Sequence, residues 1–492
     1  MNQLVHFLES NGGAVTHLRT DRLEPALVRL IAVVLLGGML GILNSTMVSV
    51  ALDPLSEEFG ASIGAIGWAS TGFLLAVTAL IPFTSWAVDR FGSKRMWLIG
   101  LTLFLAGSLA CAFAWNVGSL IGFRVVQGLG AGILDPLVLV LLARGAGPAR
   151  AGRVMGLMGV VLSLGPVLGP VAGGAVLEFL SWRWMFWSSV PLGLLALLLA
   201  VKVVPADAPS GTEAAHRRLD VIGLALLGPG FSALVLALTQ SAERSAFVDR
   251  PVLVPLVLGV VVLIAYATHA LRVRRTPPLI DLSLFQSSSF TASVSVMTLN
   301  GLATFASLFA LPLYYQQAHG HGTLTAGLLV TPIGLGAAIA MPLAGTLSDR
   351  VGSRSLAQGG AVAAAMGGLW LTRISADTSE VWPSAAALIM GAGMGFVGAP
   401  TMGSLYRTLP GPLVPQGSSV LYMLNQLGAA VGIALVAVIM KTLGDGDVMS
   451  GIHGVYWFTV VTLAVMLIAT VFLPGRSEDA PAAAAGPAAV SR

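Results

Sequence analysis

The chain is short of charge and of cysteine, and each shortage excludes a class of protein. Charged residues fill 10% of its 492 positions, whereas a soluble domain carries roughly 25%. Cys111 is the only cysteine, so no disulfide can form within one chain. A Walker loop is also lacking, and the Gly-x-Gly stretches lie in apolar runs rather than after a strand. We therefore expect neither nucleotide binding nor work driven by ATP through this chain.

Histidine offers little for a metal site. Of the seven histidines, only His319 and His321 are close together, and no third ligand lies near them along the chain. No pairing of a nucleophile with a base is evident either. We expect no enzymatic activity, no metal site and no cofactor.

Long apolar stretches dominate the sequence instead. Hydrophobic residues fill 56% of the positions, and 59 glycines suit helices that pack closely in lipid. A spanning helix needs about 20 apolar residues, and the sequence predicts an all-α integral membrane protein with fourteen such helices. They cover residues 27–50, 64–88, 96–115, 118–142, 153–177, 183–203, 219–240, 251–272, 288–315, 324–347, 356–374, 382–406, 417–441 and 454–473.

The basic residues orient these helices. An even number of spans puts both termini on one side, and cytoplasmic loops carry an excess of Lys and Arg. With the termini inside, 20 of the 26 basic residues fall in cytoplasmic segments. Because they lie in short loops rather than in one patch, the net charge of +4 does not indicate nucleic-acid binding. We expect a monomeric, multi-pass protein of the cell membrane, surrounded by lipid, with both termini cytoplasmic.

One charged sequence occurs twice, after the second and after the tenth predicted helix. The first copy reads Asp89-Arg90-Phe91-Gly92-Ser93-Lys94-Arg95, and the second reads Asp349-Arg350-Val351-Gly352-Ser353-Arg354. The dipole at a helix C-terminus disfavours an aspartate, so each copy needs cationic or N–H partners, such as the start of another helix. A glycine at the fourth position permits the tight turn. We predict a gating role, and an ordinary charged hairpin is the alternative.

The spacing of the two copies indicates the organisation of the domains. They are 260 residues apart (89 to 349), which corresponds to eight helices. Two parallel six-helix halves with an inserted pair would give that spacing, and such halves suit alternating access around a midplane site. The predicted parts are a cytoplasmic N-terminal segment 1–26, a first bundle 27–203, an inserted pair with cytoplasmic linkers 204–287, a second bundle 288–473 and a disordered cytoplasmic tail 474–492.

Small residues form a stripe on the fifth predicted helix. Gly165, Gly169 and Gly173 recur every four residues, while Pro166 and Pro170 favour a bend. A bent helix with a smooth face at the interface of the two halves could rock or seal against leaks. Plain tight packing is the alternative.

These motifs resemble those of the major facilitator superfamily. The charged hairpins are similar to its loop Gly-x-Leu-Ala-Asp-Arg-x-Gly-x-Lys/Arg, although Ser85 stands at the leading glycine of the first copy. Arg124-Val-Val-Gln127-Gly128 resembles its fourth-helix motif, and residues 165–174 resemble its antiporter motif, which marks exporters. Residues 182–186, 278–285 and 311–316 resemble markers of the 14-helix drug/proton antiporter branch. The resemblance implies a major facilitator fold and proton-coupled export.

The first helix departs from that branch, and two charged residues lie deep in the fourth. Its members usually have an aspartate in the first helix where this chain has Asn44, which cannot titrate. Arg124 and Asp135 lie well inside the fourth helix, where a charge costs at least ~2.5 kcal/mol and is functional by default. They share a face within about 20° and are separated by roughly 16 Å. If Arg124 is level with Asp53, helical rise puts Asp135 as deep as Ile42–Asn44.

We predict that Asp135 carries the proton. No charged residue lies three or four positions away, and a desolvated carboxyl can bind and release a proton as its surroundings change. The alternative is a neutral acid beside the helix bend at Pro136, whose ring frees the carbonyl of Gly132. The rival carrier is Asp53, near the outer end and able to pair with Arg124.

Substrate contacts are expected from polar and aromatic residues inside the spans. They are Asn44, Gln127, Asn300, Tyr314, Tyr315, Gln316, Tyr422 and Asn425. Because no second buried acid accompanies Asp135, a neutral or lipophilic substrate is favoured over a cation. The hypothesis is proton-coupled efflux of a lipophilic drug, antibiotic or lipid-like compound. The alternative, motivated by Asn44, is an uncoupled facilitator or a transporter-like sensor.

Overall fold

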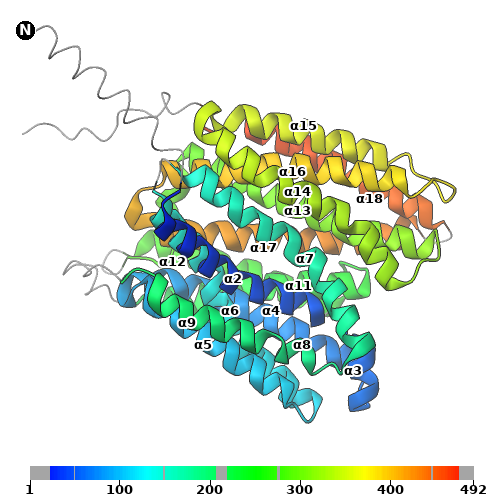
Figure 1. Cartoon of the computed structure of the whole chain (residues 1–492), viewed down its shortest axis with the longest axis horizontal. Helices are drawn as coiled ribbons and strands as arrows, with labels where there is room; N and C mark the ends of the chain where they lie inside the picture. The colour runs from blue at the N-terminus through cyan, green and yellow to red at the C-terminus, as the bar shows by residue number, and fades with distance from the viewer. Residues whose placement is uncertain are drawn as a thin grey trace, which may run out of the picture.

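Every regular element in the described part of the chain is a helix (Figure 1). The computed structural model describes residues 23–48, 50–147, 150–206, 219–273, 277–444 and 447–475, apart from the side chains at positions 53, 63 and 323. The first long helix starts and the last one ends at the same end of the bundle, which we call the termini end. The opposite end is called the far end. The predicted N-terminal segment and tail lie mostly outside the described residues.

Six long helical segments make up the first half of the bundle. They are α2 (Pro25–Val48), α4 (Ile63–Phe91), α5 (Ser93–Ala112), α6 (Val117–Ala146), α7 (Ala151–Phe179) and the segment formed by α8 (Trp184–Trp187) and α9 (Ser189–Val203). A short helix that the hydropathy did not predict, α3 (Leu52–Phe59), lies at the far end. The long helices begin at capping residues: Ser62 accepts the N–H of Ala65, and Asn116 forms a capping box with Ser119.

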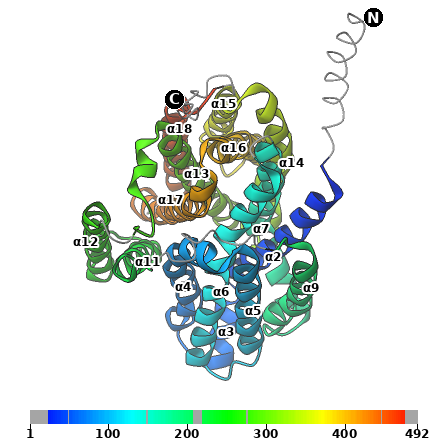
Figure 2. The same cartoon turned by 90° about the vertical axis from the view of Figure 1, so that its left-hand side faces the viewer.

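The second half repeats this arrangement. It contains α13 (Ser288–Gln317), α14 (Thr323–Val351), α15 (Ser353–Leu371), α16 (Val381–Thr408), α17 (Val414–Leu443) and α18 (Val448–Thr470), with the short helices η2 (Leu282–Gln286) and η3 (Gly411–Leu413) before α13 and α17. Figure 2 shows the two halves as separate groups of helices that meet along α7 and α17. Helix α7 packs against α14 and α16, and α17 packs against α4, α6 and α11.

The inserted pair stands beside the two halves. It consists of α11 (Val221–Arg244) and α12 (Arg250–Arg272), and α12 is the outermost helix (Figure 2). Helix α11 packs against α4 and α17, so the pair is attached where the halves meet. Only 17% of the apolar stretch of α12 is buried. Its exposed valines and leucines give it the surface of a helix in contact with lipid.

All fourteen predicted spans are helical in the structure. Thirteen helices of the described chain are long and apolar enough to cross a membrane. The predicted span 356–374 corresponds to α15, which has 19 residues. This helix is less apolar than the other thirteen, because it contains one arginine, one glutamine and four glycines. It still packs inside the second half against α16 and α18. The all-helical membrane fold is therefore confirmed, while the domain boundaries stay a prediction.

Candidate transport site

Asp135 lies in the interior of the bundle, on α6. Its carboxylate Oδ2 accepts a hydrogen bond of 2.7 Å from the hydroxyl of Tyr422, which belongs to α17 in the other half. The sequence places no partner for Asp135 within its own helix, and the structure supplies one 287 residues away. Asp135 and Tyr422 thus join the two halves directly through one hydrogen bond.

The surroundings of this pair are apolar and nearly closed. A small cavity is lined by Leu35, Gly38, Ile42, Asp135, Val138, Met158, Val161, Leu162 and Tyr422, from helices α2, α6, α7 and α17. It has space for about one water molecule. A drug-sized ligand fills several hundred Å³, so this conformation holds no formed substrate cavity here.

The backbone hydrogen bond that Pro136 removes from α6 is replaced without the carboxylate of Asp135. Pro136 lies inside α6 and frees the carbonyl of Gly132. The hydroxyl of Thr84 on α4 donates to that carbonyl at 3.2 Å. Asp135 is therefore not needed to repair the helix, and its carboxylate points to Tyr422 instead. This geometry weighs against a purely structural role for Asp135.

Arg124 forms the centre of a second buried polar group, within the first half. Its Nη1 donates to the side-chain oxygens of Asn44 and Gln127, both at 2.7 Å, and its Nε donates to the carbonyl of Ala69 at 3.2 Å. The guanidinium also lies over the ring of Phe73 at 4.1 Å. None of the carboxylates with described side chains pairs with it. The cation is held by neutral dipoles.

Asn44 and Gln127 extend this network to further helices. Gln127 donates to Ser108 of α5 at 2.6 Å, and Asn44 donates to the carbonyl of Met185 at 3.3 Å. The group therefore connects α2, α4, α5, α6 and α8. Both side chains were predicted to face a substrate, and the structure places them against Arg124.

The depth estimate assumed that Arg124 is level with Asp53. Arg124 instead bonds to Asn44, on α2, while the side chain of Asp53 lies outside what the structure describes. Asp135 lies beside Gly38, Gly41 and Ile42, and this range overlaps the predicted level of Ile42–Asn44 at Ile42.

The second charged hairpin joins the halves at the termini end. Asp349, at the end of α14, accepts hydrogen bonds from the backbone N–H groups of Gly152 and Arg153 at 3.1 and 3.0 Å. Those groups belong to the first turn of α7, where the helix dipole favours an anion. Arg407 of α16 pairs with the same carboxylate at 2.7 Å and donates to Ser353 at 2.5 Å. The predicted need for N–H and cationic partners is met here.

The first charged hairpin has the same turn. Gly92 has φ +90° and Gly352 has φ +96°, both in the region that favours glycine. Arg144, at the end of α6, donates to Ser93 at 2.8 Å, as Arg407 does to Ser353. Neither arginine was predicted from the sequence to have a role here. A detectable signal existed, because Arg144 and Arg407 end the fourth helix of their halves.

The basic residue five positions after each aspartate binds the end of a sixth helix. Lys94 Nζ donates to the carbonyl of Val201, near the end of α9, at 2.8 Å. Arg354 Nε donates to the carbonyl of Leu473, just after α18, at 2.8 Å. Terminal carbonyls of a helix lack internal partners and attract cations. Each hairpin thereby fastens the third helix of its half to the sixth.

A segment that follows the inserted pair lies beside the first hairpin. We call residues 277–281 the return linker. Tyr266 of α12 both donates to the carbonyl and accepts from the N–H of Ile280, each at 3.0 Å. Asp281 N–H donates to Gln416 of α17 at 3.0 Å, and Ser85 of α4 donates to the carbonyl of Leu279 at 3.4 Å. Ser85, Asp89, Leu279 and Gln416 line a small cavity at this place.

The glycine stripe of α7 faces a different helix from the one expected. A side chain at Gly165, Gly169 or Gly173 would meet Ile42, Thr46 or Met47 of α2, in the same half. The contact with α14 of the other half is made by a second set of glycines nearer the start of α7. Those are Gly152, Gly156 and Gly159, which lie against Gly345, Met341 and their neighbours. The predicted motif packs within one half, and the unpredicted set forms the interface.

The remaining predicted substrate residues are divided between two places. Asn425 donates to the carbonyl of Met297 at 2.9 Å, and the side-chain oxygen of Asn300 is buried without a partner among the described residues. Tyr314, Tyr315 and Gln316 lie together near the far end of α13. The hydroxyl of Tyr314 donates to the carbonyl of Ser375 at 2.9 Å, away from Asp135.

Similarity to known proteins covers nearly the whole chain. The family model described as Major Facilitator Superfamily matches residues 34–433 and 294–491. A multidrug resistance protein B homolog of Mycobacterium tuberculosis is 38% identical over 423 residues, which are 85% of this chain and 77% of that protein. A lincomycin resistance protein LmrB of Listeria monocytogenes is 28% identical over 428 residues, 87% of this chain and 89% of the relative.

Solved structures share the fold at low sequence identity. The proton:xylose symporter XylE matches with a TM-score of 0.66 at 16% identity, over 91% of this chain and 96% of that one. The human organic anion transporter MFSD10 matches with a TM-score of 0.64 at 17% identity, over 89% of this chain and 100% of that one.

Proposed function

The chain belongs to the major facilitator superfamily, in its multidrug-resistance branch, and we propose that it exports a lipophilic small molecule in exchange for protons. Relatives over more than four-fifths of the chain are named for resistance to several drugs or to lincomycin. It is a transporter and not an enzyme. The interior around Asp135 and Tyr422 is mostly apolar, which suits a neutral or lipophilic substrate better than a strongly charged one.

The hydrogen bond between Tyr422 and Asp135 carries the proposal of proton coupling. The two residues belong to different halves, so any separation of α6 from α17 takes the hydroxyl away from the carboxylate. Asp135 then exchanges an apolar, hydrogen-bonded setting for one reached by water. Its affinity for a proton changes with that setting. A proton bound in one conformation and released in the other couples the two movements.

Alternating access would use the contacts at the termini end. Asp349 binds the start of α7, and the glycines of α7 lie directly against α14. We propose that both termini are cytoplasmic, so that this conformation is closed toward the cytoplasm. Breaking the Asp349 contacts would open a path from that side, and the predicted gating residues would act there.

Arg124 would support transport indirectly, by holding helices of the first half together. It holds five helical segments of the first half through Asn44, Gln127 and backbone carbonyls. In this proposal the network keeps that half rigid while the second half moves. Asp53 remains the rival proton carrier. Among the predicted substrate residues, we assign Asn300, Tyr422 and Asn425 to the cavity that opens, because they lie in the middle of α13 and α17, whereas Tyr314, Tyr315 and Gln316 lie near the far end of α13.

The test is transport into inside-out vesicles under an imposed pH gradient, with a panel of lipophilic compounds. Wild-type protein is expected to accumulate a compound only with the gradient. Asp135→Asn should abolish this accumulation and still allow downhill exchange. Tyr422→Phe, which keeps the ring and removes the hydroxyl, should shift the pH dependence without abolishing transport. A fully coupled Asp135→Asn protein would overturn the assignment.

An uncoupled facilitator is the second candidate, because Asn44 replaces the acid of the first helix. A facilitator would transport the substrate only down its own concentration gradient, and an imposed pH gradient would not change the rate in wild type. Asp53→Asn, measured in parallel, separates a carrier at Asp53 from one at Asp135. A cysteine introduced at position 211, between the first half and the inserted pair, tests the orientation, since it should react only with reagent on the cytoplasmic side.

A further inference from the structure

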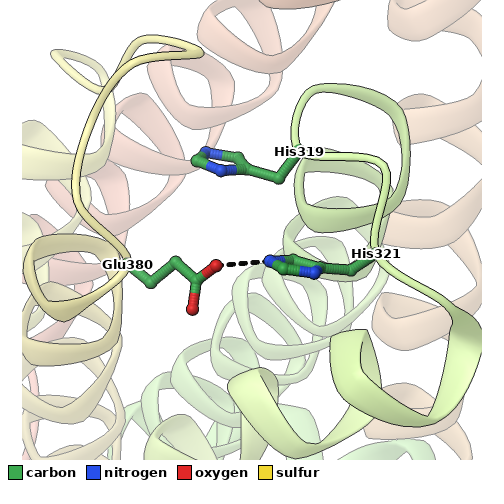
Figure 3. A group of neighbouring side chains, drawn as sticks. All are labelled: His319, His321 and Glu380. Carbon is green, nitrogen blue, oxygen red and sulfur yellow. Dashed lines mark hydrogen bonds and ion pairs between the residues drawn. The ribbon is translucent and has the colours of Figure 1, made fainter.

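Two histidines extend together from the loop between α13 and α14 at the far end. Gly320 separates them and has φ +70°, which lets the chain turn sharply between them. The rings of His319 and His321 are stacked, with centroids 5.9 Å apart and planes 7° from parallel. Figure 3 shows both side chains reaching from this loop toward Glu380, which comes from the loop before α16.

Glu380 is the third ligand that the sequence did not place near the histidines. One ligand atom from each of His319, His321 and Glu380 lies within 4.8 Å of the other two. Glu380 already forms an ion pair with His321. Two imidazole nitrogens and one carboxylate oxygen are a donor set that Zn²⁺ accepts, with a fourth position left to water. Bond lengths of about 2.0–2.2 Å to zinc require the three groups to move closer by rotation of side chains.

The hydrogen bonding of His319 leaves one ring nitrogen able to bind a metal. The hydroxyl proton of Tyr314 is donated to the carbonyl of Ser375 at 2.9 Å. That hydroxyl also lies 2.8 Å from His319 Nε2, so it must accept the Nε2 proton there. The lone pair of the neutral ring then resides on Nδ1. Metal-binding histidines commonly donate their second nitrogen to such a partner, which fixes the ring.

The cluster is open to water, so an ion can enter. The side chains of His321 and Glu380 are 29% and 40% exposed. The three residues lie beyond the ends of the spanning helices, in two loops that both belong to the second half. An ion bound here would join these loops without touching the other half, and its effect would be separate from the contacts of Asp135.

We propose that His319, His321 and Glu380 bind a divalent transition-metal ion of the Zn²⁺ class at the far end of the second half. The simpler alternative is an ion pair between His321 and Glu380 that needs no metal. The two differ in what removal of His319 does, because His319 contributes a ligand to the metal but is no part of the pair.

Calorimetric titration of the purified full-length protein with ZnCl₂ tests the site. The protein is stripped with a chelator and carries an affinity tag that contains no histidine. Wild type should bind about one Zn²⁺ per chain, and Mg²⁺, which prefers oxygen ligands, should not bind. His319→Ala, His321→Ala and Glu380→Gln should each lower the affinity by at least tenfold. Tyr314→Phe, which removes only the outer partner, should lower it by about tenfold.

Asp377→Asn is the matched control, because it removes an exposed acid from the same loop as Glu380. It should bind Zn²⁺ as wild type does. Thermal unfolding provides a second readout: Zn²⁺ should raise the melting temperature of wild type and of Asp377→Asn equally, and should raise that of the ligand variants and of Tyr314→Phe less. The absence of saturable binding in wild type, or unchanged binding in His319→Ala and His321→Ala, would overturn the proposal. Neither measurement depends on transport.

Discussion

The two charged hairpins share a backbone turn and lie beside different segments of the chain. Both turn at a glycine with φ near +90°, and both receive an arginine from the fourth helix of their half. Asp349 then reaches directly across to α7 of the other half. Beside Asp89, the return linker lies between α4 and α17 and is bonded to both. The turn is therefore the same in both copies, whereas the segments that connect the halves beside each copy differ.

The inserted pair accounts for the difference. The chain must leave α12 and return to α13, and this return passes between α4 and α17 at the termini end. Tyr266 fixes the linker there with two hydrogen bonds. At the second hairpin the halves are joined directly, by the side chain of Asp349 and the start of α7. At the first hairpin they are joined partly through the return linker. Four predictions test this asymmetry.

Gly156→Leu should have the largest effect, because it acts where the second hairpin brings α7 onto α14. A side chain at this position would meet the backbone of Met341 and Pro342. The helices would be held apart, and Asp349 could not reach the start of α7. We expect transport to fall to background and stability to fall by about 1–3 kcal/mol. Vesicle transport and thermal unfolding measure the two effects.

Gly359→Leu on α15 is the control for that change. Gly359 is exposed, and no atom lies within 4 Å of the position of an added side chain. Its transport should match wild type. If Gly156→Leu transported equally well, close contact between α7 and α14 would not be required.

Asp349→Asn should slow transport about tenfold, and Asp89→Asn should slow it less. A hydrogen bond to a charged group contributes about 1.5–3 kcal/mol, and 1.4 kcal/mol corresponds to tenfold. At the first hairpin the return linker also joins the halves, so part of the connection remains. Substrate binding in detergent should persist in both variants. Equal slowing would show that the two hairpins are equivalent despite their different contacts.

Tyr266→Phe should release the return linker from α12. The loss of two neutral hydrogen bonds costs about 1–2 kcal/mol, read as a lower thermal stability. In the double variant with Asp89→Asn, the loss of thermal stability should be smaller than the sum of the two single losses, because both residues act on one contact between the halves. Tyr456→Phe is the matched control, since that hydroxyl is buried with no partner among the described residues. Full additivity would separate the linker from the hairpin.

Lys94→Gln and Arg354→Gln should have the smallest effects and should have equal ones. Each removes a cation from the last carbonyls of a sixth helix, which contributes about 0.3–1 kcal/mol. Arg95→Gln is the control, because the second copy has Ser355 at that position. Unequal losses of thermal stability would extend the asymmetry from the contacts between the halves to the interior of each half.

Local sequence patterns predict the fold well because a membrane leaves few alternatives. Unpaired backbone groups are too costly in lipid, so an apolar stretch of the right length becomes a helix, as all fourteen did. The hairpin turn was also predictable, since Gly92 and Gly352 stand at matching places and adopt matching dihedrals. Asp135 could be placed inside the bundle because it lies at the centre of an apolar helix.

Partners across the bundle could not be predicted in this way. Tyr422 is 287 residues from Asp135, and Glu380 is 59 residues from His321. The rotation of a helix about its axis decides which neighbour each stripe meets. On α7, Gly165 and Gly169 face α2, whereas Gly156 faces α14. Periodicity reveals that a stripe exists, but packing determines what covers it.

The bonds made by Lys94 and Arg354 also set an order of assembly during synthesis. The partner of Lys94 follows it by 107 residues, so the first half can close before the inserted pair has been translated. The partner of Arg354 is Leu473, which follows it by 119 residues and comes just after α18. Domains made first generally fold first on the ribosome. The first half of a nascent chain can therefore be clamped while the inserted pair and the second half are still to be made, and the second half can be clamped only once α18 has been translated.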